Sequence, residues 1–201
     1  VRRWKRVAST AAKKTVANAI TVVKDHFRIM TLSNSTLVAQ ALAGLNRRVE
    51  VIASESRPAG EGVRLAQYLQ EHGVDVTLCV DAALPGMVEQ CDGVMIGCDC
   101  AMSRFAVNKT GSYPLALACM RNKVPLYLLC PSSKFLARDR AYLYQVIDHD
   151  EGELALPVPA GVHLINRYFE KVPWDLVCKV VFEGGVEKPD QFLNRFGESP
   201  V

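Results

Sequence analysis

Several patterns are absent from this sequence of 201 residues, and each absence narrows what the chain can be. No apolar run reaches the roughly 18 residues that a membrane-spanning helix needs, so we expect no membrane partner. No glycine-rich dinucleotide fingerprint follows the first predicted strand, and no Walker A phosphate loop occurs, so we expect no cofactor. No secretory signal pattern opens the sequence, which predicts a cytoplasmic protein.

Acidic residues are absent from the first 24 positions, which hold seven basic ones. Apolar residues recur there at helical spacing, so the stretch predicts a helix. The helix either docks on RNA or an acidic partner, or connects other elements with one solvated face, and we favour the second interpretation. The net charge of the whole chain is only +3, which is too small to favour nucleic acid as a partner.

A second cysteine or histidine pair at hairpin-like spacing is also absent, although Cys98-Asp99-Cys100 suggests a metal ligand set. Zinc sites usually combine two such pairs, so we expect no metal. The seven cysteines are odd in number and lie within predicted strands and helices. This is typical of reduced thiols in a cytosol and not of a disulfide framework.

The sequence does contain a regular alternation of strand and helix patterns. Short apolar runs are separated by stretches in which apolar residues recur at helical spacing, the runs being 28–31, 49–53, 74–80, 93–96 and 124–130. One helix is predicted over 82–90, and residues 97–113 are predicted as a loop. Such alternation with short connections indicates an α/β fold, an open parallel sheet with helices on both faces.

Polar residues gather in or beside the turns that follow these strands. Right-handed crossovers place every strand-to-helix turn at one edge of a parallel sheet, where ligands bind. The residues that carry suitable chemistry are Ser33, Arg57, Asp81, Asp99, Asn108, Lys109 and Lys134. A carboxylate, an amide and an ammonium group within one stretch predict a site for a small, polar, anionic ligand.

Two of these turns have simpler explanations. The small polar residues 33–36 either cap the following helix or offer free backbone N–H groups to an anion, and the sequence leaves both open. Arg57 fits a surface salt bridge or a bidentate contact to phosphate or carboxylate. The glycines and the proline around Arg57 favour the ligand contact.

Several stretches, taken together, resemble one protein family. They are Glu55-Ser56-Arg57-Pro58 with Glu61-Gly62, Gly97-Cys98-Asp99, Asn108-Lys109-Thr110-Gly111-Ser112-Tyr113, Ser133-Lys134-Phe135, Asn166-Arg167-Tyr168-Phe169-Glu170 and Glu183-Gly184-Gly185-Val186. The family contains the alpha, beta and delta subunits of eukaryotic translation initiation factor 2B. It also contains methylthioribose-1-phosphate isomerase and ribose-1,5-bisphosphate isomerase.

The resemblance implies a Rossmann-like ligand-binding domain over residues 26–201. Residues 1–25 would be a connecting helix, the remnant of an N-terminal helical domain. The implied ligand is a phosphorylated sugar or a nucleoside monophosphate, and the implied partner is a second copy of the chain or a related subunit. The ligand-binding positions implied are Asn34, Ser35, Arg57, Glu61, Gly62, Asn108 and Lys109.

Two functions follow from the resemblance. The first is that of a regulatory or non-catalytic protein similar to an initiation factor 2B subunit. The second is an aldose–ketose isomerase of a phosphorylated pentose, in which the catalytic pair is a cysteine after the first strand and the aspartate of the Gly-x-Asp motif. Asp99 matches the aspartate, and Ser33 occupies the cysteine position. A serine hydroxyl is a far poorer acid or base than a thiol, so Ser33 favours the first function.

Overall fold

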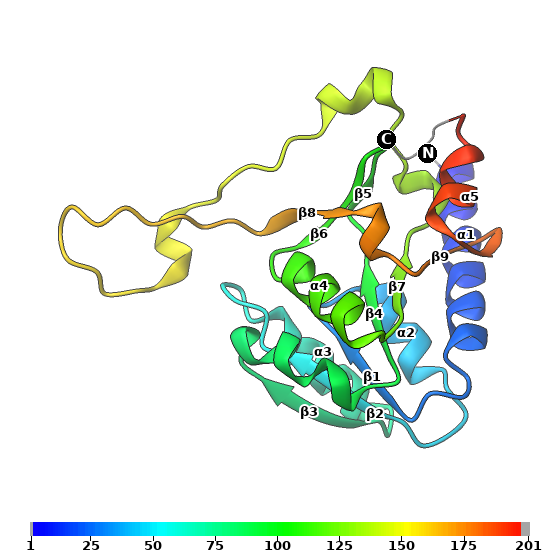
Figure 1. Ribbon diagram of the computed structural model, residues 1–201, viewed down its shortest axis with the longest axis horizontal. Helices are drawn as coiled ribbons and strands as arrows, with labels where there is room; N and C mark the ends of the chain where they lie inside the picture. The colour runs from blue at the N-terminus through cyan, green and yellow to red at the C-terminus, as the bar shows by residue number, and fades with distance from the viewer. Residues whose placement is uncertain (1, 198–201) are drawn as a thin grey trace.

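The computed structural model describes residues 2–197, with side chains from residue 7 onward, and is shown in Figure 1. The basic side chains at positions 2, 3, 5 and 6 of the predicted first helix therefore lie outside the described residues. A seven-stranded sheet forms the centre, in the order β10-β9-β7-β4-β1-β2-β3. Its strands are β1 (Arg28–Thr31), β2 (Glu50–Ser54), β3 (Asp75–Cys79), β4 (Gly93–Gly97), β7 (Leu126–Leu129), β9 (Lys179–Phe182) and β10 (Gly185–Glu187).

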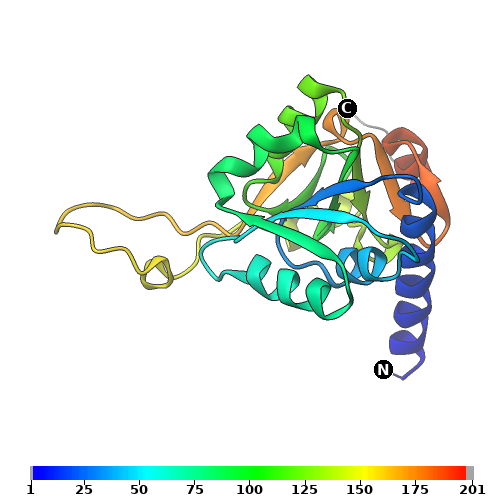
Figure 2. The same ribbon diagram turned by 90° about the horizontal axis from the view of Figure 1, so that it is seen from below.

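All neighbouring strands of this sheet run parallel except the edge pair of β9 and β10. Helices cover both faces (Figure 2), which confirms the predicted α/β fold. One face packs against α1 (Arg2–Val22), α2 (Thr36–Ala43) and α3 (Glu61–Glu71). The other face packs against the 3₁₀ helices η1 (Asp81–Gln90) and η5 (Trp174–Leu176), with α4 (Ser112–Asn122) and α5 (Pro189–Asn194).

The apolar runs of the strands exist because both faces of the sheet are buried. Successive residues of a strand point to opposite faces. In β4, Val94 and Ile96 belong to the apolar cluster that includes α4, whereas Met95 belongs to the cluster that includes α2. A strand covered on both sides therefore needs an apolar residue at every position, as β4 has.

The predicted helix at 82–90 is instead the 3₁₀ helix η1. Pro85 lies inside it and lacks the N–H that an α-helical hydrogen bond would need. The apolar spacing of Leu84 and Val88 is nevertheless used, because both side chains are buried against the sheet. The predicted helix is therefore present, as a 3₁₀ helix.

The predicted loop at 97–113 is also wrong, since it contains two strands of a second sheet. Strands β5 (Cys100–Ala101) and β6 (Phe105–Lys109) form an antiparallel pair, and β8 (Phe169–Pro173) pairs with β6. Asn108 and Lys109 consequently lie at the end of a strand, opposite Glu170 and Phe169. This second sheet fixes the two side chains more firmly than a loop would.

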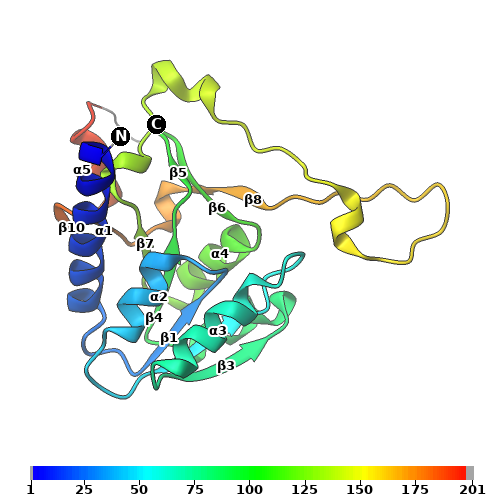
Figure 3. The same ribbon diagram turned by 180° about the vertical axis from the view of Figure 1, so that it is seen from behind.

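Residues 144–166 project away from the body of the molecule in all three overall views (Figure 3). This projecting segment contains the 3₁₀ helix η4 (Glu151–Leu154) and lies between η3 (Arg138–Leu143) and β8; the remaining short helix, η2 (Ser132–Lys134), follows β7. Within residues 2–197, no helix combines the length and apolar character that crossing a membrane requires.

Candidate functional site

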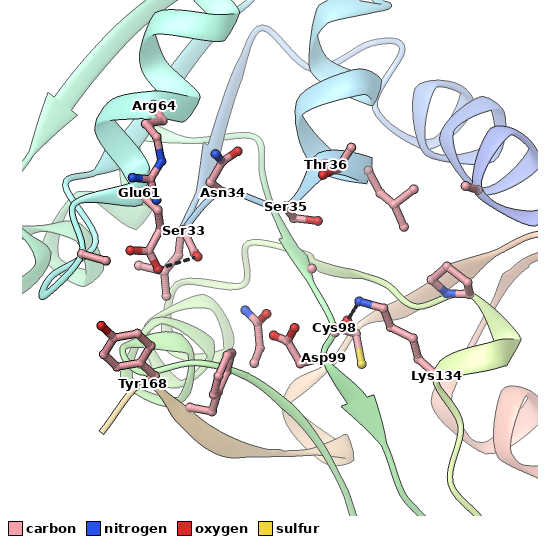
Figure 4. A pocket seen from close by; sticks show the side chains of 18 residues that line it. Ser33, Asn34, Ser35, Thr36, Glu61, Arg64, Cys98, Asp99, Lys134 and Tyr168 are labelled. Carbon is pink, nitrogen blue, oxygen red and sulfur yellow. Dashed lines mark hydrogen bonds between the residues drawn. The ribbon is translucent and has the colours of Figure 1, made fainter. Parts of the chain in front are cut away.

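A cavity of about 670 Å³ opens at the carboxyl ends of β1 and β4, the edge at which the sequence predicts a ligand. Six of the predicted site residues line it: Ser33, Asn34, Ser35, Glu61, Asp99 and Asn108. Figure 4 shows Ser33, Glu61 and Tyr168 on one side and Cys98, Asp99 and Lys134 on the other. The turn after β1, the start of α3 and the end of β4 thus share one hollow.

Asp99 lies two residues beyond β4, with its side chain open to the cavity. Its backbone N–H donates to the carbonyl of Val107 at 2.8 Å, which ties it to the second sheet. Partial desolvation in this recess raises the pKa of the Asp99 carboxyl, and the charges of Lys134 and Lys109 oppose the rise. A carboxyl whose pKa is raised in a cavity is a candidate for acid–base chemistry.

Ser33 lies two residues beyond β1 in a left-handed backbone conformation, with φ of 69°. Its N–H donates to Ser56 Oγ at 2.9 Å, and Ser56 is itself left-handed, with φ of 61°. The Ser33 hydroxyl donates to Glu61 Oε1 at 3.2 Å. Non-glycine residues adopt this conformation at a cost, and such residues cluster at functional sites.

Glu61 is the first residue of α3, and its side chain is 15% exposed. Its Oε1 lies 2.6 Å from Nζ of Lys109, whose side chain is only 3% exposed. Lys109 Nζ also lies 4.5 Å from the centre of the Tyr168 ring, a cation–π contact. Lys109 is therefore held behind Glu61 and Tyr168 and is not among the residues that line the cavity.

Asn108 is 4% exposed, and a residue of α4 holds its side chain by a hydrogen bond. Its Nδ2 donates to Ser112 Oγ at 2.8 Å, and that hydroxyl donates to the carbonyl of Lys109 at 2.6 Å. The N-cap position of α4 belongs to Gly111, and Ser112 is the first residue of the helix. Ser112 orients the two predicted ligand-binding residues before it.

The N-terminus of α4 is occupied by a protein carboxylate. Glu170 Oε1 accepts the N–H groups of Gly111 and Tyr113 at 2.8 and 2.7 Å. Anions bind at helix N-termini because free N–H groups and the helix dipole favour them. Glu170 occupies that site here, so the N–H groups of Gly111 and Tyr113 at the N-terminus of α4 are not available to a ligand.

Besides Lys109, two further predicted ligand-binding residues lie outside the cavity lining. The Arg57 guanidinium donates to the carbonyl of Leu154 in the projecting segment at 2.7 Å. The backbone N–H of Arg57 donates to Asp81 Oδ2 at 2.7 Å. Gly62 packs on β2, where a Cβ atom would overlap the carbonyl oxygen of Ser54. Gly62 thus lets α3 start close to the sheet and so places Glu61.

Thr36, Arg64 and Tyr168 also line the cavity and were not among the predicted residues, whereas Lys134 was named from the sequence only as a residue of the polar turns. Lys134 Nζ donates to the carbonyl of Cys98, which holds its charge next to Asp99. Arg64 lies one helical turn after Glu61 and is exposed at the cavity. Helical spacing from Glu61 would have found Arg64, whereas Tyr168 arrives from the far end of the projecting segment with no local signal.

The chain as a whole is similar to known proteins. A model of the Initiation factor 2 subunit family covers residues 2–189 of the chain. The chain belongs to this family. The resemblance noted in the sequence is thereby confirmed.

Some similar proteins are named as sugar-phosphate isomerases and others as translation initiation factors. Ribose 1,5-bisphosphate isomerase of Archaeoglobus fulgidus is 30% identical over 175 residues, which is 84% of this chain and 56% of the relative. Methylthioribose-1-phosphate isomerase of Rhodopirellula baltica is 28% identical over 195 residues, 85% of this chain and 55% of the relative. The chain thus spans little more than half the length of these curated relatives.

Among solved structures, translation initiation factor eIF-2B of Pyrococcus horikoshii OT3 superimposes with a TM-score of 0.84. The two sequences are 25% identical, and the match covers 94% of this chain and 68% of that one. The α/β architecture with a mostly parallel seven-stranded sheet is therefore that of the family.

Proposed function

We propose that the chain binds a phosphorylated pentose in the cavity and interconverts its aldose and ketose forms, with Asp99 as the acid–base group. The observation that carries this proposal is the Asp99 carboxyl, which is open to the cavity, has a raised pKa and lies near Lys134. Relatives named as isomerases of ribose 1,5-bisphosphate and methylthioribose 1-phosphate support it.

In a pentose 1-phosphate the C1 oxygen carries the phosphate, so the ring opens first: the C1–O4 bond breaks and O4 takes up a proton. The Asp99 carboxylate takes the proton from C2 and returns it to C1, and the C2 hydroxyl loses its proton and becomes the ketone, which replaces the proton taken up by O4. Lys134 stabilises the negative charge that develops on the C2 oxygen. Ser33, at the turn after β1, completes the proton path directly or through an ordered water.

A second function, binding without turnover, is favoured by one observation. Ser33 is a weak acid, and its hydroxyl is already engaged as a donor to Glu61 at 3.2 Å. In this case the cavity holds a sugar phosphate or a nucleoside monophosphate, and the bound ligand regulates the chain as a subunit similar to initiation factor 2B. The fold shared with the Pyrococcus horikoshii factor supports this alternative.

The partner that we propose is a second copy of the chain. The projecting segment carries five apolar side chains that are 40–69% exposed: Ile147, Leu156, Val158, Val162 and Ile165. Exposed apolar side chains gathered on one segment mark interaction surfaces, and two-fold dimers are the commonest assemblies. Sedimentation of the wild type and of Ile165→Asp tests this proposal, because a dimer should become a monomer in the variant.

Product analysis decides between the two functions. The protein is incubated with ribose 1,5-bisphosphate or methylthioribose 1-phosphate, and formation of the ketose is followed by NMR. Turnover that Asp99→Asn abolishes, while Asp92→Asn at the other end of β4 does not, supports the isomerase. A thermal shift with either compound but no ketose supports binding alone, since a ligand at 100 times its dissociation constant adds ~2.7 kcal/mol. Neither turnover nor a thermal shift with sugar phosphates or nucleoside monophosphates overturns both.

A further inference from the structure

The ion pair of Glu61 and Lys109 is the most deeply buried pair of charges at the cavity. The side chains are 15% and 3% exposed, and their nearest atoms are 2.6 Å apart. Lys109 Nζ therefore has its charge balanced inside the protein. An anion that entered this corner would meet the Glu61 carboxylate first, because Glu61 lines the cavity and Lys109 does not.

Glu61 nevertheless keeps one free acceptor. Its Oε1 takes the Ser33 hydroxyl and faces Lys109, whereas its Oε2 is buried and has no hydrogen-bond partner within residues 7–197. A buried carboxylate oxygen without a partner is costly unless a ligand supplies a donor. Of the groups on a phosphorylated sugar, a hydroxyl donates a hydrogen bond and a phosphate dianion does not.

The cations available to an anion lie elsewhere. Lys134 is across the cavity, on the far side of Asp99 from Glu61 (Figure 4), and no ion pair involves it in the described part of the chain. Arg64 is exposed at the rim, one turn along α3 from Glu61. The cavity thus has the Glu61–Lys109 ion pair at one corner and, on the other side, Lys134, which forms no ion pair in the described part of the chain and lies next to Asp99.

We propose that Glu61 is a specificity-determining residue: with its charge balanced by Lys109, it accepts a sugar hydroxyl through Oε2 and excludes phosphate from its corner, so that the phosphate lies towards Lys134. This inference rests on the proposed binding of a phosphorylated pentose. It gives Lys109 a different part from the phosphate contact expected from the sequence, since Lys109 acts through Glu61. The ligand is thereby oriented with its hydroxyls towards α3.

The first test is the affinity for inorganic phosphate, measured by calorimetry on the full chain. Glu61→Gln removes the charge in front of Lys109 and should tighten phosphate binding by about tenfold or more. Glu71→Gln makes the same change of charge at the far end of α3 and should leave the affinity at the wild-type value. Lys134→Met should weaken it by about tenfold. Equal affinities for wild type and Glu61→Gln, including no binding by either, overturn the proposal.

Glu61→Gln leaves a buried ammonium without its partner, so a double variant guards against a failure to fold. Glu61→Gln with Lys109→Met removes both charges and should bind inorganic phosphate within about twofold of the wild type, because the pair carries no net charge. Loss of phosphate binding in this variant means that Lys109 holds the phosphate, and the proposal is then wrong.

The second test uses ribose 5-phosphate and measures how much its affinity exceeds that of inorganic phosphate. The amide oxygen of Glu61→Gln, Lys109→Met still accepts a hydroxyl, so the excess should remain. Glu61→Leu, Lys109→Met lacks the acceptor, and the excess should fall by about tenfold. Equal excess in the two variants contradicts the hydroxyl contact. If the wild type binds inorganic phosphate but not ribose 5-phosphate, the proposed function is contradicted. The phosphate affinities of the variants then still test whether Lys109 balances the charge of Glu61.

Discussion

Two aspartates flank the same strand of the sheet and behave in opposite ways. Asp92 directly precedes β4, and its carboxylate accepts the backbone N–H groups of Phe27 and Arg28 at 2.7 and 2.9 Å. These hydrogen bonds, that to Arg28 above all, lower the pKa of Asp92, although some desolvation opposes them. Asp99 follows β4, no protein donor is recorded for its carboxyl among the described residues, and desolvation raises its pKa.

The difference separates a structural edge of the sheet from a functional one. At the amino end of β4 the charges are matched, as Arg28 with Glu50 at 2.6 Å also shows. At the carboxyl end Glu61 Oε2 lacks a partner and Ser33 is held at positive φ. Unsatisfied polar atoms and strained backbone lower stability, and they occur elsewhere too, as at Arg47 Nε and Lys123; beside the cavity, however, both occur together, as expected for a ligand site.

The sharpest way to break this comparison is Asp99→Asn. If Asp99 moves the proton, turnover should fall by a factor of about 10²–10⁴. The free energy of unfolding at pH 7 should stay equal or rise, because the variant removes a carboxylate whose ionisation the fold opposes. Kinetics and urea unfolding on the same preparation measure both. A large loss of stability would place Asp99 with Asp92 as a structural residue.

Gly62→Ala sharpens the comparison from the side of α3. The added methyl group overlaps the carbonyl of Ser54, so α3 must move, and we expect a loss of about 3 kcal/mol in the free energy of unfolding. Ligand binding should weaken too, since Glu61 moves with the helix. Gly86→Ala is the matched control, because nothing lies near its added methyl group. Unchanged stability of Gly62→Ala in urea unfolding would refute this account of how α3 is placed.

Asp92→Asn should have a smaller effect, confined to stability. The amide oxygen still accepts the two N–H groups but without a charge, which costs about 1 kcal/mol in the free energy of unfolding. Ligand affinity, measured by calorimetry, should equal that of the wild type. A change in affinity larger than about twofold would show that the two ends of β4 are coupled.

The smallest expected effect is in the pH dependence of stability. The folded-state pKa of Asp92 is lowered, so its contribution is present above the unfolded-state value near 3.8 and is lost as the pH falls through the folded-state value. The pKa of Asp99 is raised, so its effect has the opposite sign: stability is lost as the pH rises from about 3.8 through the folded-state value. Urea unfolding of both Asn variants between pH 2 and 7 measures the two slopes, and slopes of equal sign would contradict the comparison.

The fold could be predicted because its central strands are local patterns. Each of the runs that became β1, β2, β4 and β7 is apolar at successive positions, and the polar turns follow from the chain direction. The second sheet could not be predicted in this way. Its strands β6 and β8 are separated by some sixty residues, and β5 has only two residues, too few for any period to show.

The candidate site divides in the same manner. Ser33, Asn34 and Asp99 were found because they follow strands directly. Tyr168 was not predicted as a site residue because a contact between distant segments decides where it lies. Arg57 stands after a strand as a ligand contact should, but Leu154, nearly a hundred residues later, accepts its hydrogen bond.

Strand β8 connects the projecting segment to β6 and to α4. It pairs with β6 along five residues, and Glu170 within it holds the first turn of α4. At this end the projecting segment is therefore joined to a strand that is fixed by pairing, and not to a flexible loop. A displacement of the segment would consequently shift α4 and the part of the cavity wall that Tyr168 and Phe169 form.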